Sequence, residues 1–333
     1  MPDWNTADAS DSVMEDLRRF MGSRVLLTAA ELDVFSRLDQ SPAEAMDLAE
    51  RLGADIRALT RLLDCLVTLG YLDKQNGQYQ LTPAGRQLSS KHGKTVLPMA
   101  LHLSHVWEGW SNLTETVRRG INPDMQPVTD RDETTCRAFI GAMDAIGTDL
   151  AEEIAADLPL TGRHCLLDVG GGCGTYTAAF LRRNQGLRAV LFDLSKVMPM
   201  AEDKLAAEGL RDRVELRAGD FYRDELPAGC DAALLSAIIH QNSPEENLEL
   251  FGKIHRALEP GGLLIIRDHI MDETRTDPPA GATFAINMLV NTSGGDTYTR
   301  HELESGLKRA GFDDIRLVRS GPRMDCLLTA HRP

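Results

Sequence analysis

Three short segments of this chain combine an apolar run with a carboxylate at its end. The first is Leu166-Leu167-Asp168-Val169 followed by Gly170-Gly171-Gly172, which predicts a buried strand that turns sharply into a helix, because glycine lets the backbone turn tightly and a ligand approach it. Phe192-Asp193 ends the next apolar run, at the spacing where nucleotide-binding folds place an acid against ribose hydroxyls. Asp220 ends a third run. In this order, the three acids indicate a nucleoside site at the edge of an α/β sheet.

Two further residues could move a proton. Residues 232–239 are nearly all apolar and predict a central strand that ends at His240. An imidazole at that edge can take a proton from a hydroxyl or thiol near neutral pH. The next strand, residues 263–267, ends at Asp268, whose carboxylate would orient the imidazole and stabilise its charged form. The alternatives are a histidine held only by loop hydrogen bonds and a strand-end acid exposed to solvent.

The elements that must position these groups follow from the hydrophobic pattern. From about residue 159 onward strands and helices alternate, which predicts a parallel sheet with helices on both faces. Helices over about 11–38, 42–52 and 56–69, followed by a hairpin with Asn76-Gly77 at its tip, predict a winged helix. Longer helical stretches over about 95–120 and 132–157 connect the two parts.

Composition excludes several partners. The net charge of −14 and pI near 5.1 argue against nucleic acid and against an anionic membrane surface. The third helix of the winged segment offers only Arg57 and Arg61 as basic groups, so a dimerisation role is favoured over DNA binding. Six cysteines without a C-x-x-C pair predict reduced core residues. With no signal segment in residues 1–10 and no apolar run of membrane-spanning length, a cytoplasmic protein is expected.

The three acid-bearing strand ends resemble the class I methyltransferases that use S-adenosylmethionine, a ligand without phosphate, and no G-K-[ST] follows the glycines. A dinucleotide dehydrogenase, which shares the first two features, and an ordinary doubly wound sheet with helix-capping acids are the rival interpretations. Over residues 12–332 the chain resembles the dimeric small-molecule O-methyltransferases of the caffeic-acid and hydroxyindole types. Their order of winged dimerisation domain, substrate helices and catalytic domain carries that resemblance.

The resemblance implies an α/β fold: a Rossmann-like, doubly wound methyltransferase domain with an N-terminal, all-helical, winged-helix dimerisation domain. It implies dimerisation through residues 1–94, substrate-pocket helices over 95–158 and cofactor binding by 159–333. S-adenosylmethionine would be the cofactor and S-adenosylhomocysteine its product, with a small-molecule acceptor and a homodimer. His240 would be the general base and Asp268 its orienting carboxylate. The cofactor-binding residues would be Asp168, Gly170, Gly171, Gly172, Asp193, Leu194, Asp220, Phe221 and Ser236. The substrate-binding residues would be His105, Trp107, Phe139, Met143, Met288, Asn291 and Thr292.

The chain departs from the family pattern at two places. His240-Gln241-Asn242 replaces the usual His-Asp-Trp, and Thr297 stands where the plant enzymes have a second glutamate beside the base. With one carboxylate fewer, methylation of a thioether or thiol, or of carbon, stays open beside O-methylation. A cofactor-binding protein that does not transfer methyl, or a winged-helix regulator, is a more distant alternative. His102 and His105 could bind a metal, but no ligand motif accompanies them, and no metal is expected.

Overall fold

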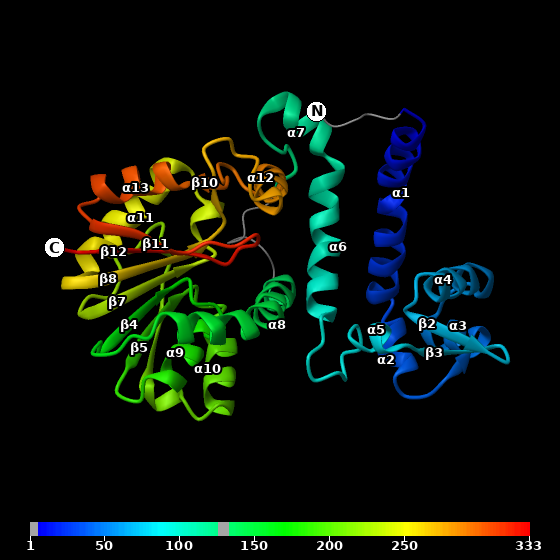
Figure 1. Cartoon of the computed structure of the whole chain (residues 1–333). Coiled ribbons are helices and arrows are strands. Elements are labelled where there is room, and N and C mark those ends of the chain that lie inside the picture. Colours follow the sequence, from blue (N-terminus) through cyan, green and yellow to red (C-terminus); the bar gives the residue numbers. More distant parts are fainter. Residues whose placement is uncertain (1–5, 126–132) are drawn as a thin grey trace. The chain divides into compact units, whose positions relative to one another are not determined.

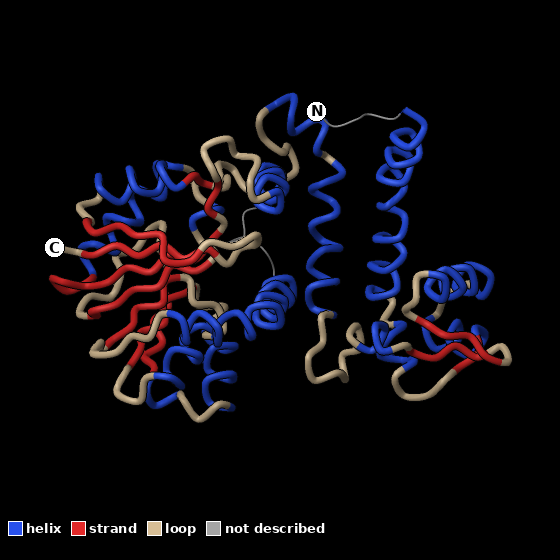
Figure 2. The backbone as a smooth tube through the Cα atoms, in the orientation of Figure 1, coloured by secondary structure: helices blue, strands red, loops and turns tan. Residues whose placement is uncertain are grey.

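The computed structural model describes residues 6–125 and 133–333, which fall into two compact units, Met1–His105 and Val106–Pro333 (Figures 1 and 2). The expectation for residues 1–10 lies in part outside the described residues. No helix in the described part of the chain is long and apolar enough to cross a membrane.

The first unit is a winged helix. Its hairpin turns at Asn76-Gly77, where both residues have positive φ (49° and 83°), as a tight hairpin turn requires. The expected single helix over 11–38 is wrong, because Asp33 adopts a left-handed conformation (φ 58°) and divides it. The elements are α1 (Thr6–Glu31), α2 (Val34–Leu38), β1 (Ala43–Glu44), α3 (Ala45–Leu52), α4 (Ile56–Thr68), β2 (Leu72–Gln75), β3 (Gln78–Leu81), α5 (Pro83–Arg86) and α6 (Leu97–Ser111), which runs past the unit boundary.

The second unit is an α/β domain preceded by helices. The helical stretch expected over 95–120 is broken at Asn112, so that α7 follows α6 as a separate helix. The elements of this unit are α7 (Leu113–Arg119), α8 (Glu133–Asp157), β4 (Cys165–Val169), α9 (Thr175–Arg183), β5 (Arg188–Asp193), α10 (Met198–Ala207), η2 (Arg211–Arg213), β6 (Val214–Ala218), β7 (Cys230–Ser236), η3 (Ile239–Gln241), α11 (Pro244–Ala257), β8 (Leu258–Asp268), β9 (Ile270–Met271), α12 (Pro279–Asn291), β10 (Tyr298–Thr299), α13 (Arg300–Arg309), β11 (Asp313–Arg319) and β12 (Cys326–His331).

The large sheet has the order β11-β12-β8-β7-β4-β5-β6. Strands β4 to β8 are parallel, whereas β12 is antiparallel to both β8 and β11. The expectation of a wholly parallel sheet is therefore wrong at this edge, because only six residues (320–325) join β11 to β12 and a crossover needs about a dozen. The chain leaves β4 toward β5 on one side and returns to β7 on the other. Such a reversal opens a crevice at the carboxyl ends of the strands.

The large sheet lies between two layers of helices (Figure 1). Two hydrophobic clusters, one on each face, hold the layers together. On one face, Phe251 and Ile254 of α11 and Leu307 of α13 pack against the sheet. On the other, Ile154 of α8 and Phe180 of α9 are fully buried. A fully buried side chain of this size contributes about 1.5–3 kcal/mol, so both layers hold the strand ends in place.

Most of the six cysteines were predicted to be reduced core residues, and one pair is an exception. Cys165 and Cys230 begin the neighbouring strands β4 and β7, and their sulfurs form a disulfide. Their separation of 65 residues hid this proximity, because only the strand order brings them together. The other cysteines, Cys65, Cys136, Cys173 and Cys326, are free thiols.

Candidate active site

The glycine turn between β4 and α9 has room only for glycine. Gly170 and Gly172 have positive φ (70° and 58°), which residues with side chains rarely adopt. A Cβ on Gly170 would lie 2.6 Å from Ile238 Cδ1, and one on Gly171 would lie 2.8 Å from Asp168 Cγ. The backbone therefore runs close against its neighbours, and the turn keeps the tight shape that the sequence predicted.

Two buried carboxylates flank this turn. Asp168 accepts a hydrogen bond from Thr177 Oγ1 (2.6 Å), and burial raises its pKa to about 6 despite that bond. Asp193, at the end of β5, accepts from the backbone N–H of Gly172 (2.8 Å) and of Leu194 (2.7 Å). Burial raises the pKa of Asp193, and the two backbone donors oppose that rise. Asp193 thus ties the glycine turn to the next strand, and its remaining lone pairs are available to a ligand.

The loop after β6 carries the third predicted acid. Asp220 Oδ1 accepts from the backbone N–H of Tyr222 (2.9 Å), and the rings of Phe221 and Tyr222 lie 4.6 Å apart. Lys253, which is 4% exposed, donates to the carbonyls of Phe221 (2.9 Å) and Tyr222 (3.2 Å) and so holds the loop. Sequence reasoning missed Lys253. The feature that could have revealed its role is its position beside Ile254 on α11, where a lysine must be buried and therefore needs hydrogen-bond acceptors.

His240 and Asp268 meet, but only Asp268 ends its strand, β8. The strand predicted over 232–239 is too long: β7 ends at Ser236, and His240 lies in the short helix η3 that follows. His240 Nδ1 lies 2.9 Å and 3.0 Å from the two carboxylate oxygens of Asp268. Both residues are buried, Asp268 completely, and Asp268 also accepts from the backbone N–H of His269 (2.8 Å). Phe284 of α12 meets the His240 ring edge to face, with 4.9 Å between centroids. The carboxylate fixes the imidazole so that Nδ1 is the atom bonded to it, which leaves Nε2 for other chemistry.

A second imidazole lies beside this pair. His269 is 5% exposed, and its ring centroid is 5.2 Å from that of Phe284. Its Nδ1 has no hydrogen-bond partner among the described residues. Burial lowers the pKa of His269, so the ring is neutral near pH 7. Sequence reasoning did not single out this residue as a site candidate.

The departures from the family pattern have structural consequences. Thr297 is buried, and its hydroxyl donates to the Gly281 carbonyl (3.3 Å). The neighbouring Asp296 pairs instead with Arg275 (3.0 Å). Asp268 is consequently the carboxylate that bonds to His240 within the described residues.

Asn242, which replaces the family tryptophan, is fully buried in a polar network. It accepts from the Tyr222 hydroxyl (2.6 Å) and donates to Asn247 Oδ1 (3.0 Å). Asn247 in turn donates to the carbonyl of Ile239 (2.9 Å), and the Tyr298 hydroxyl donates to the Asn242 carbonyl. The network connects the loop after β6 with the turn that carries the imidazole.

The residues expected to bind the acceptor lie in several elements. On α12, Met288 is buried, the Thr292 hydroxyl donates to the Met288 carbonyl (2.7 Å), and Asn291 donates to Asn287. Asn287 also accepts from the indole N–H of Trp110 (2.9 Å), a residue of α6.

The other expected acceptor residues are spread over α6 and α8. Phe139 of α8 packs on the cluster of Ile140 and Cys173 beside the glycine turn, and Met143 follows on the same helix. Trp107 belongs to α6, and His105 is an exposed residue at the end of the first unit. Within the described residues, no group of three or more His, Cys, Asp or Glu side chains could hold a metal ion.

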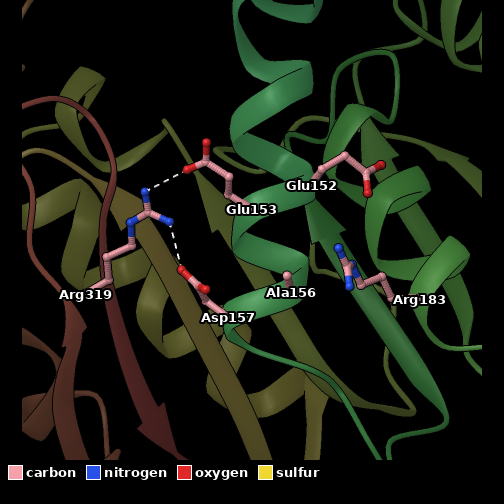
Figure 3. A pocket seen from close by; sticks show the side chains of 6 residues that line it. All are labelled: Glu152, Glu153, Ala156, Asp157, Arg183 and Arg319. Atoms are coloured by element: carbon pink, nitrogen blue, oxygen red, sulfur yellow. Dashed lines mark hydrogen bonds and ion pairs between the residues drawn. The ribbon is translucent and has the colours of Figure 1, made fainter.

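The one surface hollow drawn in Figure 3 lies elsewhere. Its lining residues come from the ends of α8 and α9 that are remote from the glycine turn, with Arg319 from β11. Arg319 is paired there with Glu153 (3.0 Å) and Asp157 (2.9 Å) (Figure 3). Because Arg319 is already matched by acids and the hollow is remote from the glycine turn, this hollow does not compete with the sheet edge as the active site.

The fold and the edge residues are those of an α/β enzyme domain that follows a winged-helix unit in the chain, and comparison with known proteins specifies the class. Residues 110–313 match an O-methyltransferase domain, and residues 14–91 match an O-methyltransferase dimerisation domain. The chain is 32% identical to the tetracenomycin polyketide synthesis 8-O-methyl transferase TcmO of Streptomyces glaucescens, over 94% of each chain. It is 31% identical to the 3-hydroxy-5-methyl-1-naphthoate 3-O-methyltransferase of Streptomyces sahachiroi, over 92% of this chain and 91% of the relative.

Among solved structures, PigF with SAH superimposes with a TM-score of 0.88 at 25% identity, over 96% of this chain and 99% of the other. The chain therefore belongs to the family of O-methyltransferases with an N-terminal dimerisation domain. It is an S-adenosylmethionine-dependent O-methyltransferase of small molecules.

Proposed function

We propose that His240 is the general base of methyl transfer to a hydroxyl of a small-molecule acceptor. The observation that carries this proposal is the contact of Nδ1 with both oxygens of the buried Asp268. If Nδ1–H donates to the carboxylate, the free lone pair is on Nε2, which then accepts the hydroxyl proton. Asp268 holds the ring in that tautomer and stabilises the imidazolium that forms. Bound S-adenosylmethionine supplies a methyl group already activated on a sulfonium, so alignment of the acceptor oxygen does much of the remaining work.

The cofactor residues are proposed on the fit of this edge to such a ligand. The glycine turn leaves the backbone bare where the methionine part would approach, and Asp193 keeps lone pairs for ribose hydroxyls. Asp220 and Phe221 would hold the adenine. The structure of PigF with SAH, a related fold, supports the same ligand here. Leu194, Gly170 to Gly172, Asp168 and Ser236 complete this proposed site.

The proposed domain roles are dimerisation for residues 1–94, acceptor binding for 95–158 and cofactor binding for 159–333. An exposed apolar face on α1 supports a homodimer. Val13, Met14, Leu17, Phe20 and Met21 recur at helical spacing and are all exposed in the single chain. In a homodimer a second copy would cover this face. Changing Leu17 and Phe20 to Asp should give a monomer in sedimentation velocity, and an unchanged dimer would reject this face. The cytoplasmic location expected from the sequence remains a proposal.

The proposed acceptor is a hydroxyl on a fused aromatic ring. Two relatives above 30% identity, TcmO and the naphthoate 3-O-methyltransferase, are named for such acceptors. Phe284 and Met288 offer an apolar surface near the base for a flat molecule. A ring hydroxyl is also acidic enough for one imidazole with one carboxylate to deprotonate.

The test is transfer of a labelled methyl group. The purified protein is incubated with methyl-labelled S-adenosylmethionine and a panel of hydroxynaphthoates, with matched thiols and thioethers in parallel. Label on an aromatic oxygen, dependent on His240, supports the proposal. Label on sulfur or carbon, or oxygen methylation that is equally fast in His240→Ala, overturns the assigned role of His240.

A further inference from the structure

Three polar side chains lie together on the α8–α9 face of the sheet, just behind the glycine turn. Arg267 is the penultimate residue of β8, Ser236 ends β7 in register with it, and Tyr176 is in the first turn of α9. Arg267 Nη1 lies 3.4 Å from Ser236 Oγ, and its guanidinium is centred 5.3 Å from the Tyr176 ring centroid. None of the roles assigned above to the base and its neighbours uses Arg267 or Tyr176.

Two buried polar atoms of this cluster lack a hydrogen-bond partner among the described residues: the Nε of Arg267 and the hydroxyl oxygen of Tyr176. Burial raises the pKa of Tyr176, while the nearby Arg267 and Ser236 act against that rise. Within the described residues, no carboxylate forms an ion pair with Arg267. A buried donor without a partner costs about 1–3 kcal/mol, so a ligand that supplies an acceptor is favoured here.

Arg319 on β11 is a useful contrast, because it is another arginine of the same sheet. Its guanidinium is paired with Glu153, Asp157 and, at 3.7 Å, Asp325. The fold therefore pairs Arg319, an arginine with no proposed ligand, with acidic side chains of the chain itself. At Arg267 no carboxylate from the described part of the chain forms an ion pair, which points to an anion from outside.

We propose that Arg267 binds the carboxylate of the methionine part of S-adenosylmethionine, with the hydroxyls of Ser236 and Tyr176 as further donors. This inference rests on the proposed cofactor site. Tyr176 follows the glycine turn directly, and β7 is the strand next to β4, so the cluster is adjacent to the backbone that the methionine part approaches. A guanidinium pairs with a carboxylate through two parallel hydrogen bonds, which suits this geometry.

The experiment compares binding of S-adenosylmethionine and decarboxylated S-adenosylmethionine, which differ only in the carboxylate, by isothermal titration calorimetry. The wild-type protein should prefer S-adenosylmethionine by about tenfold to a hundredfold, the range expected for a charge-assisted hydrogen bond. Arg267→Met should remove most of this preference by weakening only S-adenosylmethionine, and Arg267→Lys should keep part of it. Arg319→Met is the matched control and should leave the preference unchanged.

Equal weakening of both ligands in Arg267→Met would mean a structural role and would overturn the inference, as would an unchanged preference. If Arg267→Met fails to fold, the same comparison in Arg267→Lys decides. The proposed function can fail separately: wild-type protein that binds neither ligand contradicts the cofactor site itself, whatever Arg267 does.

Discussion

The two sides of the sheet edge are built differently. On the cofactor side, around β4, β5 and β6, each acid bonds to residues close in the sequence: Asp168 to Thr177, and Asp193 to Gly172, 21 residues away. On the acceptor side, the base pair joins residues 28 apart, and the surrounding contacts span 56 residues (Tyr298 to Asn242) and 177 residues (Trp110 to Asn287). The two acids beside the glycine turn thus make contacts over shorter chain separations than the acceptor side does, and the loop after β6 is in addition held by the distant Lys253. Members of one family can accordingly keep the same cofactor and differ in the methyl acceptor.

If the acceptor side carries the proton chemistry, its loss should be the most costly change. We expect His240→Ala to lower kcat by about a hundredfold to ten-thousandfold, the usual contribution of a general base. Affinity for S-adenosylhomocysteine should be almost unchanged, because the glycine turn and Asp193 do not contact the imidazole. Steady-state kinetics and calorimetry on one preparation measure both, with His301→Ala, an exposed position, as control. Unchanged kcat would indicate an acceptor that carries no proton, such as a thioether.

The pH dependence of stability tests whether the carboxyl group of Asp168, on the cofactor side, is shielded from water. Burial raises the pKa of Asp168 from 3.8 to about 6, so the native protein binds this proton more tightly than the unfolded chain. The stability from this group is therefore complete below pH 3.8 and is lost as the pH rises through about 6. Between about pH 4 and pH 7, Asp168→Asn should gain at most about 3 kcal/mol of unfolding free energy relative to wild type.

Urea unfolding of the protein without cofactor at both pH values measures this difference. Asp272→Asn is the control with the opposite sign, because hydrogen bonds from Thr274 lower the pKa of Asp272. Because this pKa lies below 3.8, the loss of stability of that variant relative to wild type with rising pH occurs mainly below about pH 4, and between pH 4 and pH 7 the two should run nearly parallel. A wild-type-like pH dependence of Asp168→Asn would mean that Asp168 does not titrate in this range, and the cofactor side would be less desolvated than its geometry implies.

On the cofactor side, Asp193 has two roles: it accepts hydrogen bonds from the protein backbone, and it is the proposed ligand of the ribose. Asp193→Ala removes the acceptor for the N–H groups of Gly172 and Leu194 and the proposed ribose contact. We expect affinity for S-adenosylhomocysteine to fall by about tenfold, with a smaller change in kcat at saturating cofactor. Asp193→Asn, which keeps an oxygen acceptor, should lose less. Unaltered binding in the alanine variant would contradict the ribose assignment and would remove the basis for separating the two sides.

The sequence was sufficient to predict the arrangement of the cofactor side and part of that of the acceptor side. Glycines before α9 and acids at the ends of β4 and β5 are visible in the chain, since a strand and its own turn are contiguous. The contact of His240 with Asp268 was also predictable, because Asp268 ends β8 and His240 follows shortly after the end of the neighbouring strand β7 in a doubly wound sheet. Their chemical roles stay predictions that the kinetic experiments address.

The remaining features depend on side-chain directions and strand order that no local pattern encodes. The bond from Thr297 to Gly281, the support of the loop after β6 by Lys253 and the pairing of Cys165 with Cys230 all join distant segments. The antiparallel direction of β12 likewise depends on the length of one connection. In each case the residue types were consistent with several partners, and packing selected one.

Tyr222 offers the finest test, because its hydroxyl connects the two sides. It belongs to the loop after β6, it donates to Asn242 Oδ1 (2.6 Å), and burial raises its pKa to about 12, so it remains a donor at all working pH values. Tyr222→Phe keeps the ring against Phe221 but leaves the buried Asn242 oxygen without this donor. We expect a loss of about 1 kcal/mol in unfolding free energy and a reduction of kcat of severalfold at most, because Asn247 still supports the imidazole turn at Ile239.

Asn242→Ala should be more destabilising than Tyr222→Phe, since it removes the hydrogen-bond partner of both Tyr222 and Asn247. If Tyr222→Phe changed only cofactor affinity and Asn242→Ala changed only kcat, the two sides would be energetically independent despite their shared hydrogen bond. Equal, non-additive effects in the double variant would instead show that the network joins them.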